Sequence, residues 1–263
     1  MKKALFQGFT KKLKQSFLRY NTQACALCAC SGRRTVCGFC LRNTAFRAQK
    51  CLLRCHACAK PLPHAEQQSD KQVSGQSIDL CADCVQKHPV QASARVLCDY
   101  EYPWDELVQQ MKFNQRIDVA HWFGHQLAKH YSAYFDQLKQ HAQELKQALI
   151  LVPVPLSQDK LDRRGFNQSA EIALMIAKAH QISLRSYLEK NRSSQQQSDL
   201  PKHLRAHNLR GVFKCVESLS QTQVILVDDV YTTGSTITEA ARVLKKAGAT
   251  QVHVITACRT NLK

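Results

Sequence analysis

Four CxxC pairs in the first third of the chain restrict its fold more than any other feature. In such a pair both thiolates can reach one Zn²⁺ at about 2.3 Å, and two pairs complete a tetrahedral site. The four pairs therefore predict two structural zinc ions. The pairs are Cys25 with Cys28, Cys37 with Cys40, Cys55 with Cys58, and Cys81 with Cys84.

The pairs can combine in two ways. Sequential pairing is the natural expectation, with the first two pairs around one ion and the last two around the other. The spacing also allows a crossed pairing, first with third and second with fourth. A disulfide framework is the competing interpretation, but the start of the chain does not resemble an export signal, and disulfides are rare in cytosolic proteins. The remaining cysteines Cys98, Cys215 and Cys258 lie in apolar, strand-like contexts and are expected to be small core residues.

Positive charge is concentrated at the start of the chain. The net charge is +17, and 13 Lys and Arg residues precede the first acid, Glu66. Such asymmetry favours a polyanionic partner such as nucleic acid. Leu5, Phe9, Leu13, Phe17 and Tyr20 would share one face of a basic helix over residues 1–24. That helix could pack on its own zinc domain, dock a partner or lie on a membrane, and we favour the first two.

From residue 96 onward the pattern alternates between strand and helix. Strands are expected at 95–102, 148–155, 182–189, 224–229 and 251–258, and helices at 104–113, 118–148, 168–179 and 236–247. Alternation of this kind predicts an α/β fold, a parallel sheet flanked by helices. No apolar stretch is long enough to span a bilayer. We expect three parts: the basic helix at 1–24, a double zinc ribbon at 25–90 and an α/β domain at 91–263.

The segment VILVDDVYTTGST, residues 224–236, carries the strongest functional signal. Ligands of parallel sheets bind at the carboxyl ends of the strands, where Asp228 and Asp229 are expected. Backbone N–H groups and hydroxyls of the following loop can hold a phosphate. Two carboxylates would repel that phosphate, so they are expected to bind sugar hydroxyls and, through water, Mg²⁺. The pattern predicts a ribose phosphate ligand. No GxxxxGK[ST] or GxGxxG motif is present.

This segment resembles the phosphoribosyl-pyrophosphate loop of type I phosphoribosyltransferases. Three further stretches, DYEYPWDELVQQMKF (99–113), LVPVPLSQDKLDRRGFNQSAEIA (151–173) and QQSDLPKHLRAHNLRGVF (196–213), together with the CxxC pairs, are similar to the competence protein F family. The resemblance runs from about Cys25 to Arg259. It implies a type I phosphoribosyltransferase-like sheet with a small N-terminal zinc-ribbon domain.

The resemblance also implies roles for particular residues. Asp228 and Asp229 would be catalytic. The VPVP segment would take the place of the pyrophosphate loop, with residues 152–156 presenting backbone donors near the diphosphate. Lys190, Gln197 and Asn208 would belong to a mobile flap, although Gln196 and Leu204 depart from the family pattern. The expected phosphoribosyl-pyrophosphate-binding residues are Asp228, Asp229, Val230, Thr232, Thr233, Gly234, Ser235, Thr236, Val154, Pro155, Arg163, Arg164, Arg192 and Arg205.

Two functions follow from the resemblance. One is a phosphoribosyltransferase-like protein that binds phosphoribosyl pyrophosphate and Mg²⁺ and acts in natural transformation, with single-stranded DNA and DNA-uptake proteins as partners. The other is an active phosphoribosyltransferase of nucleotide metabolism with no direct DNA role. A cytoplasmic location is expected, with attachment to the inner membrane only through DNA-uptake partners.

Overall fold

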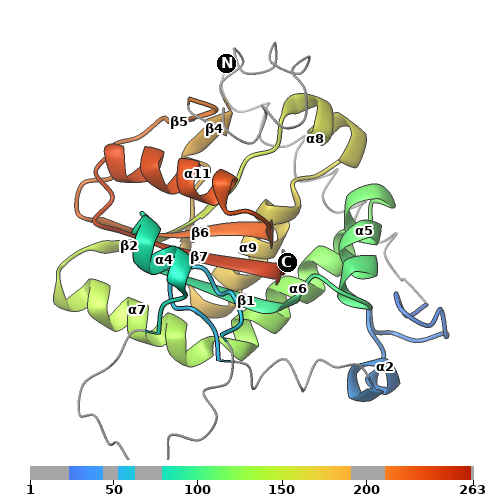
Figure 1. Ribbon diagram of the computed structural model, residues 1–263. Helices are drawn as coiled ribbons and strands as arrows, with labels where there is room; N and C mark the ends of the chain where they lie inside the picture. Colours follow the sequence, from blue (N-terminus) through green and yellow to red (C-terminus); the bar gives the residue numbers. More distant parts are fainter. Residues whose placement is uncertain (1–23, 44–52, 63–78, 191–210, 262–263) are drawn as a thin grey trace, which may run out of the picture. The chain divides into compact units, whose positions relative to one another are not determined.

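The computed structural model describes residues 24–43, 53–62, 79–190 and 211–261 (Figure 1). The chain divides into two compact units after Thr44. The first unit contains the short helix α2 (Gly38–Asn43). The second contains the sheet and also the cysteine pairs from Cys55 to Cys84. The predicted boundaries at residues 24 and 90 remain predictions.

The second unit is organised around a five-stranded parallel sheet. Its strands are β1 (Ser93–Asp99), β2 (Ala148–Pro153), β3 (Ser183–Leu184), β6 (Thr222–Tyr231) and β7 (Gln251–Arg259). The spatial order is β1-β7-β6-β2-β3, and every adjacent pair is parallel. The parallel sheet flanked by helices that the alternating pattern predicts is therefore confirmed.

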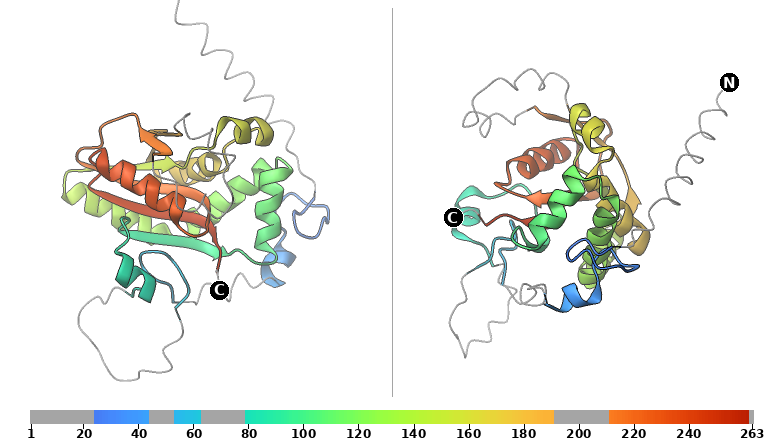
Figure 2. Two further views of the ribbon diagram at one scale, coloured as in Figure 1. Left: turned by 45° about the horizontal axis from the view of Figure 1, so that its top comes forward. Right: turned by 90° about the vertical axis from the view of Figure 1, so that its right-hand side faces the viewer.

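Helices cover both faces of this sheet (Figures 1 and 2). On one face, Val224 and Leu226 of β6 share a core with Ile237 and Leu244 of α11 (Ser235–Lys246). Alternate residues of a strand point to opposite faces, so Ile225 and Val227 lie on the other side. That side is covered by α6 (Ile117–His130), α7 (Ser132–Glu144) and α9 (Gln168–His180).

Close packing of α6 on α9 depends on a glycine. A Cβ added at Gly124 would lie 2.7 Å from both the Ile172 carbonyl oxygen and the Met175 Cβ. Only a residue without a side chain lets the two helices approach so closely. This contact joins α6 to the middle of α9, the helix whose first turn carries Ser169.

Two predicted elements are each divided in the structure. The predicted helix at 118–148 is two helices, α6 and α7, and Ala148 already belongs to β2. The predicted strand at 182–189 is divided between β3 and β4 (Leu188–Lys190), and β4 pairs in a separate antiparallel sheet with β5 (Phe213–Cys215). Cys98 and Cys258 are fully buried as predicted, whereas Cys215 is only partly buried.

Three further helices complete the described elements. These are α4 (Ala82–Lys87), α5 (Trp104–Phe113) and α8 (Gln158–Arg164). Helix α5 matches its predicted bounds and follows β1 directly, so it starts at the carboxyl edge of the sheet. No helix within the described ranges is long and apolar enough to cross a membrane.

Candidate phosphoribosyl site

The two adjacent aspartates lie at the carboxyl end of β6. Strand β6 continues to Tyr231, so Asp228 and Asp229 are still part of the ladder, and Asp228 pairs with Thr256 of β7. Successive side chains of a strand point to opposite faces, so the two carboxylates have different neighbours. The predicted position of the two aspartates at the carboxyl end of the strand is therefore confirmed.

Asp228 faces the amino end of α9. Ser169 donates a hydrogen bond from Oγ to Asp228 Oδ1 at 2.8 Å, and the Asp229 amide donates to the same oxygen at 2.9 Å. Burial and the neighbouring Asp229 carboxylate raise the pKa of Asp228 to about 7, against the opposing effects of Ser169 and Lys112. At neutral pH this carboxyl can therefore hold or release a proton.

Asp229 has a cationic partner from α5. Lys112 Nζ lies 3.1 Å from Asp229 Oδ2, and the side chains of Lys112 and Asp229 are only 20% and 13% exposed. Sequence analysis did not identify Lys112 or Ser169 as site residues. Lys112 lies inside the stretch 99–113 and Ser169 inside 151–173. Their place in these family-like stretches was the signal in the sequence that could have identified them.

The hydroxyl-rich loop is short and tightly built. Thr232 and Thr233 follow β6, and α11 begins at Ser235 with Gly234 as its N-cap at φ +83°. Thr233 and Ser235 hydroxyls are 2.9 Å apart and both side chains are solvent-accessible. A helix amino end with free N–H groups and nearby hydroxyls attracts anions. Val230 is buried in the strand, and Thr236 lies in the first turn of α11.

Positive groups lie close to the acidic pair. Arg164 Nη1 donates to Gln168 Oε1 at 3.1 Å, next to Ser169 in the chain. Arg163 is exposed and bonds the Asp159 carbonyl of its own helix. Burial lowers the pKa of Lys190, as does the charge of Lys160, while Asp228 raises it. Arg164 therefore bonds to α9, the helix that carries Ser169, whereas Arg163 bonds within its own helix.

The VPVP segment is fixed to the sheet. The Val154 amide donates to the Val227 carbonyl at 2.9 Å, and Asn167 Nδ2 donates to the Val154 carbonyl at 3.0 Å. Pro155 has no amide hydrogen. Neither Val154 nor Pro155 can therefore donate a backbone hydrogen bond to a diphosphate, contrary to the expectation for these two residues. The predicted Arg192 and Arg205, with Gln197 and Asn208, lie outside the described residues.

Eight of the cysteines form two clusters of four. Each cluster combines two consecutive CxxC pairs, so the pairing is sequential. Within each cluster the four sulfur atoms all lie within 4.8 Å of one another. A tetrahedral Zn–S distance of about 2.3 Å requires sulfurs about 3.8 Å apart. Cys25 and Cys40 are at 3.9 Å, Cys28 and Cys37 at 3.8 Å, and Cys58 and Cys81 at 3.7 Å. The donor set and its spacing fit zinc. The members are Cys25, Cys28, Cys37 and Cys40 in the first cluster and Cys55, Cys58, Cys81 and Cys84 in the second.

A family model matches the part of the chain that holds the two aspartates and the loop. The phosphoribosyl transferase domain model matches residues 162–263. The glutamine phosphoribosylpyrophosphate amidotransferase structure from B. subtilis is 25% identical over 53% of this chain and 27% of that chain, with a TM-score of 0.31, which is too low to support an argument.

Two relatives match larger parts of the chain. The DNA utilization protein YhgH of Escherichia coli K12 is 30% identical over 90% of this chain and 95% of its own length. Competence protein F of Haemophilus influenzae is 30% identical over 66% of this chain and 76% of its own length. The chain therefore belongs to the competence protein F family, which includes the DNA utilization proteins.

Proposed function

We propose that the chain binds phosphoribosyl pyrophosphate together with Mg²⁺ at the carboxyl edge of β6. One observation carries the proposal: two adjacent carboxylates lead directly into a hydroxyl-rich loop and the amino end of α11, with Lys112 and Ser169 holding the carboxylates in place. The phosphoribosyl transferase domain match over residues 162–263 supports it independently.

Each group has a chemical task in this proposal. Loop amides with Thr232, Thr233 and Ser235 would bind the 5-phosphate. Asp228 and Asp229 would accept hydrogen bonds from the ribose hydroxyls. Asp228 and Asp229 would also hold Mg²⁺ through water, which would supply positive charge for the diphosphate leaving group. Arg164 supplies a guanidinium fork suited to a diphosphate.

Transfer would proceed by substitution at ribose C1. A bond from an acceptor nitrogen to C1 would form as the bond from C1 to the diphosphate oxygen breaks, and the acceptor would lose a proton. The residues contribute mainly by positioning and charge stabilisation. Asp228, with its pKa near 7, can take up that proton when the acceptor is close.

We further propose that the protein works in natural transformation, on single-stranded DNA in the cytoplasm, alongside DNA-uptake proteins. The names of its relatives, DNA utilization protein and competence protein F, support this role. Arg33, Arg34 and Arg42 are exposed on the first compact unit and offer phosphate-binding charge.

Calorimetric titration of the full chain with phosphoribosyl pyrophosphate and Mg²⁺ tests the binding proposal. The Asp228→Asn, Asp229→Asn double variant should bind more weakly by roughly 1 to 3 kcal/mol per charged hydrogen bond lost. Equal affinity in the double variant would remove the ribose role of these residues.

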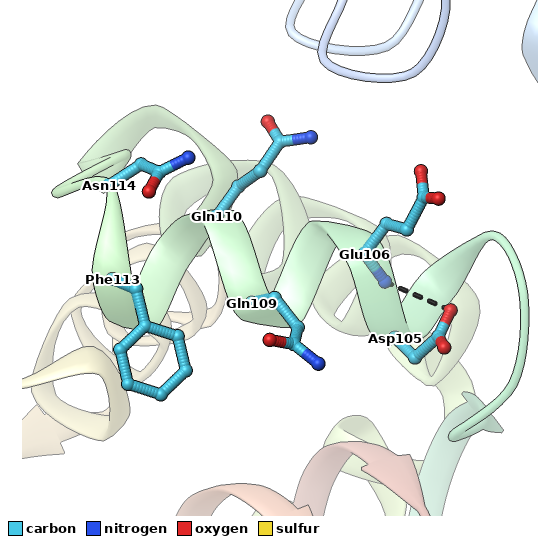
Figure 3. Close-up of a pocket in the computed structure, with 6 residues that line it drawn as sticks. All are labelled: Asp105, Glu106, Gln109, Gln110, Phe113 and Asn114. Atoms are coloured by element: carbon cyan, nitrogen blue, oxygen red, sulfur yellow. Dashed lines mark hydrogen bonds between the residues drawn. The ribbon is translucent and has the colours of Figure 1, made fainter.

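A second candidate is an active phosphoribosyltransferase of nucleotide metabolism. The observation in its favour is an open hollow of about 360 Å³ on α5, the helix that supplies Lys112. Figure 3 shows the side chains around it, which combine carboxylates, amides and an aromatic ring that could contact a base. The lining residues are Asp105, Glu106, Gln109, Gln110, Phe113 and Asn114.

Pyrophosphate release separates the two candidates. We would measure it from phosphoribosyl pyrophosphate with a panel of free bases and with single-stranded DNA ends. Turnover with a free base alone would favour the metabolic enzyme. Turnover only with DNA ends, or binding without turnover, would favour the DNA-handling role.

A further inference from the structure

The second cysteine cluster is part of the core that carries the phosphate loop. Cys55, Cys58, Cys81 and Cys84 are all buried and share one apolar core with Val96 of β1, Val224 of β6, Tyr231 and Ile237. A separate zinc ribbon would bury its cysteines in its own small core. Here the cysteines belong to the same core as residues of the sheet and α11.

Backbone and ionic contacts fasten the cluster to β1. The Ala94 amide donates to the His56 carbonyl at 2.7 Å. Arg54 forms two hydrogen bonds of 3.0 Å with the Asp99 carboxylate, and its Nη1 also donates to the Ala59 carbonyl at 3.1 Å. The Asp99 side chain is 5% exposed. A buried bidentate pair of this kind fixes the Cys55 turn at both of its ends.

A single glutamine connects this turn to the end of β6. Gln91 Nε2 lies 3.0 Å from the Ala57 carbonyl oxygen and 3.2 Å from the Tyr231 hydroxyl. Ala57 stands between Cys55 and Cys58, and Gln91 and Tyr231 are 3% and 4% exposed. The amide therefore bridges the cysteine turn and the residue before the loop, away from solvent.

Tyr231 in turn supports the loop. A Cβ added at Gly234 would meet the Tyr231 hydroxyl oxygen at 2.7 Å and ring carbons at 3.0 and 3.1 Å. The Gly234 backbone therefore rests directly on the phenol. On the other side, the Arg259 guanidinium lies 4.5 Å from the centre of the Tyr231 ring. The position of Gly234, which is the N-cap of α11, thus depends on where this ring is held.

We propose that Gln91 and Tyr231 are positioning residues through which the metal-loaded second cluster holds the phosphate loop in its binding conformation. The first cluster, in the other compact unit, has no such role. The effect on loop order stands on these contacts alone. The effect on phosphoribosyl pyrophosphate affinity rests on the proposed function.

The test measures amide hydrogen exchange of residues 231–236 in the full chain, with zinc content measured in parallel. Gln91→Leu removes both hydrogen bonds and keeps the cysteines. We expect two zinc ions to remain and exchange in the loop to rise about 5- to 10-fold, the net effect expected when a bridge of two buried hydrogen bonds is lost. Tyr231→Phe should give a smaller rise, because the Gln91 bond to Ala57 survives.

Gln223→Leu is the matched control. Gln223 is also a fully buried glutamine, it lies at the opposite end of β6, and its Nε2 bonds Gln147 Oε1 at 2.9 Å. It should lower global stability without a selective rise in loop exchange. An equal rise in Gln223→Leu, or none in Gln91→Leu, would overturn the proposal.

A second comparison tests the metal itself. Cys81→Ser weakens the second cluster and Cys37→Ser weakens the first. Only Cys81→Ser should increase loop exchange, and combining it with Gln91→Leu should add less than the sum of the two. A rise with Cys37→Ser alone would contradict the assignment. The exchange results could agree with these expectations while the chain binds no phosphoribosyl pyrophosphate. That outcome would refute the proposed function but would leave the coupling between the second cluster and the loop intact.

Discussion

Lys112 of α5 and Asp229 of β6 form an ion pair across the candidate site, with 3.1 Å between Nζ and Oδ2. The pair joins a helix outside the matched phosphoribosyl transferase domain to the strand that carries the acidic motif. It reduces the repulsion that two adjacent carboxylates would exert on a diphosphate. A site with this charge balance can accept an anion and a metal ion together.

Replacing Lys112 should weaken ligand binding. Lys112→Met leaves Asp229 without its partner and should lower the affinity for phosphoribosyl pyrophosphate about 10- to 100-fold, because the unbalanced carboxylates then repel the diphosphate. Lys112→Arg should retain most of the affinity. Calorimetry measures both, with the exposed Lys129→Met as control. Affinity of Lys112→Met within twofold of the parent would exclude this role.

The raised pKa of Asp228 predicts a pH-dependent stability. Its folded-state pKa of about 7 exceeds the ordinary aspartate pKa of 3.8, so the folded state binds the proton more tightly and loses stability as pH rises from about 4 to 7. Asp228→Asn removes this cost. The variant should gain free energy of unfolding over the parent at pH 8 by roughly 1 to 3 kcal/mol, and less at pH 5.5.

Denaturant unfolding at the two pH values checks this prediction. The difference between variant and parent is the quantity to follow, because acid also releases metal from cysteine sites in both chains. The exposed Asp159→Asn serves as control and should show no such trend. If Asp228→Asn raised the free energy of unfolding equally at both pH values, a raised pKa of Asp228 would not be the cause.

Gly234 should tolerate no side chain. Gly234→Ala combines a φ of +83° with a contact of 2.7 Å to the Tyr231 hydroxyl, so the loop must shift. Gly211 has a similar φ of +79° but nothing within 4 Å of an added Cβ. Gly211→Ala therefore measures the backbone strain alone, about 1 kcal/mol. Gly234→Ala should cost more in thermal unfolding and should also lower anion affinity; equal costs would show that the contact is unimportant.

Metal analysis should find two zinc ions per chain. Each cluster supplies four sulfurs at the spacing of a tetrahedral site. Elemental analysis of Cys37→Ser should give one ion, since three thiolates bind zinc far less tightly than four at neutral pH. A single ion in the parent protein would contradict the prediction that both clusters bind zinc.

The exposed arginines of the first unit should bind single-stranded DNA. Each phosphate neutralised on a single strand contributes about 0.7 to the slope of log affinity against log salt. Charge reversal at Arg33, Arg34 and Arg42 should flatten this slope and leave phosphoribosyl pyrophosphate binding unchanged. Reversal at the exposed Lys87, Lys129 and Lys178 changes net charge equally and is the control. Equal losses in both variants would indicate only a general charge effect.

Much of the fold could be predicted because its signals are local. The apolar run Val224–Val227 and the periodic face of residues 104–113 each specify an element from adjacent residues. The division of 118–148 at Tyr131 could not be predicted, because Phe135 and Leu138 continue the apolar spacing across the break. The separation of β3 from β4 depends on pairing with β5, a contact between residues distant in the chain.

The candidate site shows the same limit. Asp228, Asp229 and the loop are contiguous and could be found in the sequence. Lys112 and Ser169 enter the site only through tertiary packing of α5 and α9. The burial of Asp228, which raises its pKa, is likewise a property of the folded chain.

The position of β7 has a consequence for how the protein is made. This strand lies between β1 and β6, yet it is the last sheet strand in the chain. While the ribosome is still at work, β1 and β6 keep unpaired edges until residues 251–259 emerge, and exposed edges of this kind favour aggregation. The first cysteine cluster closes within residues 25–40 and can take its metal early. The second shares its core with Tyr231 and Val252, so it becomes fully packed only when translation has passed the last strand.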